Sequence, residues 1–234
     1  QLMLAVREAL GSPGKLARLP LRLLRILIEP PVVPVPEQAA AAPVSRLLPR
    51  YLPHRRSAIR DWPADRPLVT VGIPCYNYGR FLGEAIDSVL TSTLQDFEII
   101  VVDDGSTEAE TLGALEDLER NSGDSRVRVV HQSNQGLAAA RNKGAALGRG
   151  KYVVSLDADD RIAPTYLEKA AWVLEHHPEH AFCYSLAQFF GAEQGLWKTE
   201  PFDLEKALQY NHVATAAMFR REAWVEAGGF RDDL

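Results

Sequence analysis

Aspartates follow two apolar segments of this 234-residue chain. The run at 152–156 is followed within four residues by three carboxylates: Asp157, Asp159 and Asp160. The run at 98–102 is followed by two: Asp103 and Asp104. Carboxylates this close repel one another unless a positive ligand sits among them, and Mg²⁺ or Mn²⁺ prefers such oxygen ligands together with substrate phosphates. Either run alone could simply cap a helix, but the two together predict a metal-assisted nucleotide site.

Strand and helix patterns alternate around these acidic motifs. Apolar runs predict strands at 69–73, 98–102, 127–130, 152–156 and 181–185. Helical spacing of apolar residues predicts helices at 81–90, 112–118, 136–147 and 164–176, with Pro164 as the first residue of the last one. The alternation indicates an α/β fold with a doubly wound, mostly parallel sheet flanked by helices. Ligands of such sheets bind beyond the carboxyl ends of the strands, where Pro74, Asp104 and Asp157 fall.

Charge is unevenly distributed along the chain. The net charge is −5, and a composition of 46% hydrophobic and 24% charged residues is typical of a globular protein. Residues 1–60 carry ten Lys and Arg against three Glu, so this part is net +7 and the remainder is net −12. Nine of the fifteen prolines lie at 30–67. We therefore expect a basic helical and Pro-rich extension at 1–66 and an α/β domain at 67–234.

Residues 15–27 repeat basic side chains every three or four positions along a leucine-rich stretch. This pattern fits a helix lying on an anionic membrane and, equally well, a helix packed on a neighbouring domain. No apolar run reaches the length of a membrane span. Without a signal-peptide pattern or an initiating Met, the chain is expected to begin inside a longer protein. Cys75 and Cys183 are expected to be reduced core residues, so we expect a cytoplasmic protein. If the basic arm formed by residues 15–27 binds lipid, we expect contact with the inner face of the membrane.

Two common nucleotide-binding signatures are missing from the sequence. The Gly-x-Gly-x-x-Gly loop is absent after the first expected strand, and no Walker-type Gly-Lys-Ser/Thr loop occurs. These absences argue against a dinucleotide-dependent oxidoreductase and a P-loop NTPase. A nucleic-acid partner is not expected either.

Several motifs of residues 67–234 resemble those of family 2 glycosyltransferases, which are nucleotide-sugar enzymes of GT-A fold. The resemblance is carried, in order, by Thr70-Val71-Gly72-Ile73-Pro74-Cys75-Tyr76-Asn77, Val101-Val102-Asp103-Asp104-Gly105-Ser106, Asn134-Gln135-Gly136 with Ala140-Arg141-Asn142, Asp157-Ala158-Asp159, and Ala227-Gly228-Gly229-Phe230. The order and spacing of these motifs make the resemblance specific.

The resemblance implies roles for individual residues. Pro74, Tyr76 and Asn77 would belong to the nucleotide pocket, and Asp104 would accept a hydrogen bond from N3–H of uracil or thymine. The guanidinium of Arg141 would meet the base or the pyrophosphate. Asp157 would hold the ribose or the metal, and Asp159 would bind Mg²⁺ or Mn²⁺ directly, leaving Asp160 as a capping or supporting carboxylate.

The reaction implied is an inverting, metal-dependent transfer of a sugar from a UDP- or dTDP-sugar to a saccharide or lipid-linked acceptor. The metal would neutralise charge on the leaving diphosphate, and a general base would take the acceptor proton. In the family this base follows the Gly-Gly-Phe segment, so we expect it beyond Leu234 and regard the domain as truncated. Asp232 and Asp233 are weak substitutes for it.

Two other functions compete with the enzyme. One is a catalytically incomplete nucleotide-sugar-binding or scaffold domain of a larger protein. The other is a nucleotidyltransferase, but its expected Gly-x-Gly-x-Arg loop is missing after the first strand. We expect the remaining histidines to be structural. His212 would be an ordinary structural residue near the acceptor side. A cluster at a helix end consists of His176, His177 and His180, and a metal site is the minor interpretation of it.

Overall fold

The computed structural model describes residues 63, 65–191, 195–197, 202–207, 209–211 and 213–231. The expected extension at 1–66 lies outside the described residues except for positions 63, 65 and 66. The basic arm at 15–27 and three further residues named above also lie outside them: His212, Asp232 and Asp233.

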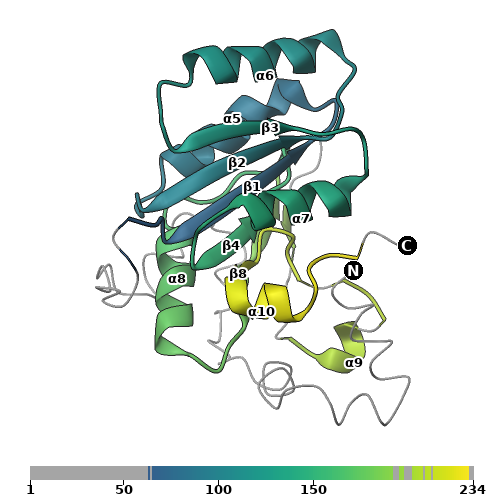
Figure 1. Ribbon diagram of the computed structural model, residues 1–234. Helices are drawn as coiled ribbons and strands as arrows, with labels where there is room; N and C mark the ends of the chain where they lie inside the picture. Colours follow the sequence, from purple (N-terminus) through teal and green to yellow (C-terminus); the bar gives the residue numbers. More distant parts are fainter. Residues whose placement is uncertain are drawn as a thin grey trace.

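A six-stranded sheet forms the centre of the described domain (Figure 1). Its spatial order is β3 (Val127–His131), β2 (Phe97–Asp103), β1 (Val69–Cys75), β4 (Tyr152–Ser155), β8 (Met218–Arg220) and β5 (Phe182–Cys183). β1 pairs in parallel with β2 and β4, and β2 pairs in parallel with β3. The prediction of a mostly parallel sheet is therefore confirmed. Both pairings of β8, with β4 and with β5, are antiparallel, and this strand was not predicted.

The strands β1, β2 and β4 are buried almost completely, which explains the apolar runs of β2 and β4. In β1 the apolar residues alternate with Thr70 and Gly72, and these are buried as well. Their register brings the three carboxyl ends to one edge of the sheet. Pro74 of β1 lies opposite Val102 of β2, and Gly72 lies opposite Ser155 of β4. The residues that follow these strands therefore meet, as expected for a parallel sheet.

Helices cover both faces of the sheet (Figure 1). The larger core joins β1 and β2 to apolar side chains of two of them, α5 (Gly79–Leu90) and α8 (Tyr166–His176). A smaller cluster of Ile100, Val102 and Ala140 lies beneath α7 (Leu137–Leu147). The remaining helices are α6 (Ala109–Asn121), α9 (Leu204–Ala207) and α10 (Arg221–Glu226).

The position predicted for Pro164 is wrong. α8 begins at Tyr166, and its N-cap is Thr165 rather than a residue before Pro164. The carbonyl of Pro164 instead accepts a hydrogen bond of 2.7 Å from the backbone N–H of Thr93, at the end of α5. This contact between loops fixes Pro164 outside the helix.

α7 lies unusually close to the sheet because small residues face each other. A Cβ added at Gly144 of α7 would lie 3.3 Å from Cα of Gly72 in β1, which is tighter than ordinary packing. A Cβ at Gly72 would make ordinary contact with Gly144 at 3.6 Å, so Gly144 is the position where a side chain would push α7 away. The close approach matters because Arg141 and Asn142 project from this helix.

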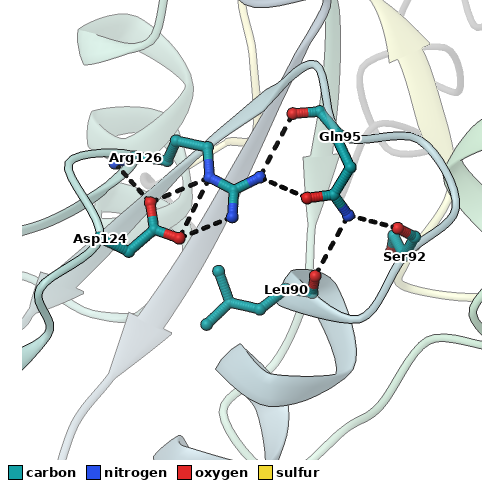
Figure 2. A network of polar contacts seen from close by, with 5 residues as sticks. All are labelled: Leu90, Ser92, Gln95, Asp124 and Arg126. Atoms are coloured by element: carbon teal, nitrogen blue, oxygen red, sulfur yellow. Dashed lines mark hydrogen bonds and ion pairs between the residues drawn. The ribbon is translucent and has the colours of Figure 1, made fainter.

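A polar network closes the opposite end of β2 and β3, where these strands begin (Figure 2). Arg126 binds the carboxylate of Asp124 and both the backbone carbonyl and the side chain of Gln95. The amide of Gln95 in turn donates to the carbonyls of Leu90 and Ser92. The hydrogen bonds from Arg126 lower the pKa of Asp124 to about 2. The network joins the loops that precede β2 and β3, at the edge of the sheet opposite the carboxyl ends of these strands.

Beyond the main sheet, β6 (Ala187–Phe189) and β7 (Gly195–Trp197) form an antiparallel pair. Within the described ranges, no helix combines the length and the hydropathy needed to cross a membrane.

Candidate functional site

A cavity of about 440 Å³ opens at the carboxyl edge of the parallel strands. Its lining comes from the end of β1, the segments after β1, β2, β3 and β4, and the start of α7. The lining residues are Pro74, Cys75, Tyr76, Tyr78, Asp104, Asn134, Gly136, Leu137, Ala140, Asp157, Ala158 and Asp159. Five predicted site residues therefore share one cavity: Pro74, Tyr76, Asp104, Asp157 and Asp159. A concave surface with aromatic walls and convergent carboxylates is typical of a small-molecule site.

Asp104 holds the loop that precedes α7. Its Oδ1 accepts hydrogen bonds from the side-chain amide of Gln132 at 2.7 Å and the backbone N–H of Gln135 at 2.8 Å. Its Oδ2 accepts one from the backbone N–H of Gly136 at 2.8 Å. Asp104 is only 3% exposed, so these donors replace the water that a carboxylate needs. A carboxylate oxygen can accept two hydrogen bonds, so Oδ2 retains capacity for one more donor.

Asn77 connects two loops rather than lining the cavity. Its backbone has a φ of 57°, a left-handed conformation that Asn tolerates better than most residues. Its Oδ1 accepts hydrogen bonds from the backbone N–H groups of Thr107 and Glu108, at 2.8 and 3.1 Å. The turn places Tyr76 and Tyr78 on either side of Asn77, and both rings are more than 40% exposed. Sequence reasoning missed Tyr78, although a second aromatic residue beside Tyr76 was the available signal.

Arg141 pairs with Asp157 beside the cavity. One terminal nitrogen of the guanidinium lies 2.7 and 2.9 Å from the two oxygens of Asp157. The Nε of Arg141 is buried and has no hydrogen-bond partner among the described residues. The guanidinium also lies 5.6 Å from the ring centroid of Phe230. Arg141 does not line the cavity in this structure; it supports a residue that does.

The loop after β4 holds its carboxylates at different depths. Asp157 is partly buried, whereas Asp159 is exposed. Burial raises the pKa of Asp160 to about 6, and the charges of Asp157 and Asp159 add to the shift. A divalent cation near this loop would offset the repulsion among the three carboxylates. The donor set consists of carboxylate oxygens, which suits Mg²⁺ or Mn²⁺.

The carboxylate of Asp103 points away from this arrangement into a separate network. It accepts the backbone N–H of Ser106 at 2.9 Å and contacts Nδ1 of His131 at 2.9 Å. Burial alone would raise the pKa of Asp103, but these hydrogen bonds lower it. His131, whose other ring nitrogen contacts Glu119, has its pKa raised mainly by Asp103. Adjacent aspartates thus have different partners.

The segment after α10 is fastened to α7. The side chain of Asn142 donates to the carbonyl of Phe230 at 2.6 Å and accepts the N–H of Phe230 at 2.8 Å. Sequence reasoning quoted both residues as motif members but gave Asn142 no role. Their pairing brings the Gly-Gly-Phe segment next to Arg141, at the side of the cavity where Asp157 lies.

Comparisons with known proteins identify the family. The model of "Glycosyl transferase family 2" matches residues 70–231, so the chain belongs to this family. Chondroitin synthase of Escherichia coli is 38% identical over 172 residues, which are 72% of this chain and 25% of the synthase. The uncharacterized glycosyltransferase EpsJ of Bacillus subtilis is 41% identical over 103 residues, 44% of this chain and 29% of EpsJ. The chain thus matches less than a third of the length of either relative.

Solved structures confirm the GT-A fold. The mannosyltransferase PcManGT of Pyrobaculum calidifontis, in complex with GDP-Man and Mn²⁺, superposes with a TM-score of 0.56 at 25% identity and covers 73% of this chain and 49% of PcManGT. Residues 1–349 of S. aureus TarS in complex with UDP give a TM-score of 0.54 at 22% identity, over 71% of this chain and 51% of that one. The expected α/β architecture is therefore shown by structure as well as by sequence.

Proposed function

We propose that the chain is a metal-dependent, inverting glycosyltransferase that moves a sugar from a UDP- or dTDP-sugar to a saccharide or lipid-linked acceptor. One observation carries the proposal. Carboxylates after β4 share a cavity with the aromatic residues after β1 and the buried Asp104 after β2. A nucleotide pocket and a cation site are thus adjacent, as the departure of a nucleoside diphosphate requires.

The metal is assigned to Asp159 and Asp157. Asp159 is exposed and lines the cavity, so it is available as a direct ligand of Mg²⁺ or Mn²⁺. Asp157 forms an ion pair with Arg141. It is either the second metal ligand or the residue that holds the ribose. When bound, the cation would neutralise the charge that develops on the leaving diphosphate. The Mn²⁺ complex of PcManGT supports a divalent ion in this fold.

The nucleoside is assigned to the pocket between Tyr76 and Asp104. The exposed ring of Tyr76 offers a flat apolar face to a base, with Pro74 beside it and Tyr78 nearby. Asp104 Oδ2 has capacity to accept the N3–H of uracil or thymine, a donor that cytosine lacks. Asn77 contributes indirectly, because it fixes the turn that carries both tyrosines.

Arg141 is proposed to serve the donor through Asp157. It holds this carboxylate in place, and its buried Nε has no hydrogen-bond partner in the described part of the chain. We propose that the general base follows the Gly-Gly-Phe segment, which Asn142 fastens beside Arg141. A saccharide acceptor is supported by the similarity to chondroitin synthase and, at 34% identity over 119 residues, to hyaluronan synthase of Pasteurella multocida.

Peripheral membrane contact through residues 15–27 remains part of the proposal, and with it a place at the cytoplasmic face of the membrane. An anionic surface contributes about 1 kcal/mol for each Lys or Arg near it. Flotation with anionic vesicles should therefore require residues 1–29 and be reversed by salt. Equal flotation of the chain with and without these residues would contradict a membrane role.

Calorimetry tests the donor site directly. UDP, dTDP and GDP are titrated into the protein with Mn²⁺ and, separately, with EDTA. We expect uracil and thymine nucleotides to bind more tightly than GDP, and Mn²⁺ to strengthen binding by at least about tenfold. Preference for GDP would overturn the assignment of Asp104, and equal affinity in EDTA would overturn the metal assignment.

A further inference from the structure

Three potential metal ligands converge in the turn between α8 and β5. His177 Nδ1 lies 3.1 Å from Oε1 of Glu179, and His180 Nε2 lies 3.9 Å from the same oxygen. All three ligand atoms lie within 4.8 Å of one another. The two imidazole rings stack with centroids 5.2 Å apart and planes inclined by 15°. Both rings therefore present a nitrogen to one carboxylate.

The backbone of this turn is fixed by contacts that do not use the three side chains. The N–H of His180 donates to the carbonyl of His177 at 3.0 Å. The guanidinium of Arg220, at the end of β8, donates to the carbonyls of His180 at 2.7 Å, His177 at 3.2 Å and Leu174. Arg220 thus anchors both histidines through their main chain. Little backbone conformational entropy therefore remains to be lost when a ligand draws the side chains together.

One ligand atom in the group lacks a partner. His180 Nε2 is buried and makes no hydrogen bond with any described residue. Zn²⁺ lies about 2.0–2.2 Å from imidazole nitrogens and carboxylate oxygens, so neighbouring atoms of a tetrahedral site are about 3.3–3.5 Å apart. The separations of 3.1 and 3.9 Å fall on either side of this range. The remaining separation, between the two nitrogens, is at most 4.8 Å, so the side chains would draw together around an ion that satisfies Nε2.

We propose that His177, Glu179 and His180 form a binding site for a divalent transition metal, with Zn²⁺ as the representative ion. Two imidazoles and one carboxylate select Zn²⁺, Ni²⁺ or Cu²⁺ over Mg²⁺ or Ca²⁺. A water molecule would complete a tetrahedral set. The ion would join the end of α8 to the start of β5 and stabilise that junction. None of the three residues lines the cavity of Asp104 and Asp159, so the proposal is independent of the glycosyltransferase assignment.

The test is a calorimetric titration of the full chain with ZnCl₂ in excess Mg²⁺, which oxygen ligands prefer. We expect Zn²⁺ to bind, and His180→Ala and Glu179→Gln each to lower the Zn²⁺ affinity by about tenfold or more. Substitution of a residue that only supports a metal ligand can already cause a loss of this size. His176→Ala is the matched control. Its ring is adjacent in sequence but stacks on Trp172 and bonds to the carbonyl of that residue, so this variant should bind Zn²⁺ normally.

Thermal unfolding provides the second measurement. Zn²⁺ should raise the Tm of the unsubstituted chain and of His176→Ala, and should raise that of Glu179→Gln by less. The half-exposed side chain of Glu179 is not needed for folding. UDP affinity should not change in any of the three. The proposal is overturned if Zn²⁺ does not bind, if all variants titrate alike, or if His176→Ala loses as much affinity as His180→Ala.

Discussion

The acidic ends of β2 and β4 look alike in sequence and differ in structure. After β2, the side chains of Asp103 and Asp104 are almost completely buried and accept hydrogen bonds from backbone N–H groups. After β4, Asp157 is partly open and Asp159 is exposed to the cavity. The same short motif therefore builds the pocket wall at one strand end and offers ligands at the other.

The difference arises from the chain that surrounds each strand end. Gly105 turns the chain after β2 with a φ of 75°, and a Cβ there would lie 2.7 Å from the backbone nitrogen of Asn134. This close approach delivers the N–H groups that Asp104 accepts. The loop after β4 instead closes on itself through the N–H of Asp160 and the carbonyl of Asp157. Its carboxylates are left to a cation or to Arg141.

Asp104→Ala tests the closed strand end and should have the largest effect. It would remove the buried acceptor of three hydrogen bonds, from the side chain of Gln132 and the backbone N–H groups of Gln135 and Gly136, so we expect a loss of about 2–3 kcal/mol in the free energy of unfolding. Urea unfolding measures this loss. Uridine nucleotides should bind poorly with or without metal, by calorimetry. A stable variant with unchanged affinity would show that Asp104 neither builds the loop nor contacts the base.

Asp159→Ala tests the open strand end. Because its side chain is exposed, the free energy of unfolding should change by less than about 0.5 kcal/mol. UDP affinity in Mn²⁺ should fall by about tenfold or more, about 1.4 kcal/mol or more, toward the value measured in EDTA, while affinity in EDTA stays the same. If Asp159→Ala and Asp104→Ala lose affinity equally in both conditions, the contrast between the two strand ends is wrong.

Much of this arrangement could be predicted because it follows from local rules. The spacing of apolar residues located five strands and four helices. The expected parallel pairing of the strands then placed Pro74, Asp104 and Asp157 at one edge of the sheet. β8 was missed because Met218–Arg220 is too short for a periodic signal, and its antiparallel pairing is decided by tertiary packing. The partners of Asn77 and Arg141 were not predictable for the same reason. They lie 30 and 16 residues away in sequence, and only the fold brings them together.

Asp160→Asn tests the strand end after β4 through the pH dependence of the free energy of unfolding. Asp160 has its pKa raised to about 6 in the fold against 3.8 in the unfolded chain, so the native state binds more protons between these values. Its ionisation therefore costs stability as pH rises through about 6. The cost is on the order of 2 kcal/mol in the absence of metal, after allowance for solvent screening of this half-buried group. In EDTA, Asp160→Asn should gain stability over the unsubstituted chain from pH 4 to 7, and Mg²⁺ should reduce the gain. A gain that does not vary with pH would contradict the burial of this charge.

The smallest effect is expected at His131, which connects the closed strand end to solvent. Its pKa is raised above 6.5, chiefly by the hydrogen bond to Asp103 and less by Glu119. A raised native pKa stabilises the protein fully below pH 6.5, and this contribution is lost as pH rises through the native value. Asp103, whose pKa is lowered, stays ionised throughout this window. His131→Gln should therefore be less stable than the unsubstituted chain at pH 5.5, and the difference should disappear once the pH is well above the native pKa of His131. The difference should be small because the ring is 51% exposed, so solvent screens the pair. NMR titration of the His131 ring gives its pKa directly, and a value at or below 6.5 would show that Asp103 is satisfied by Ser106 alone.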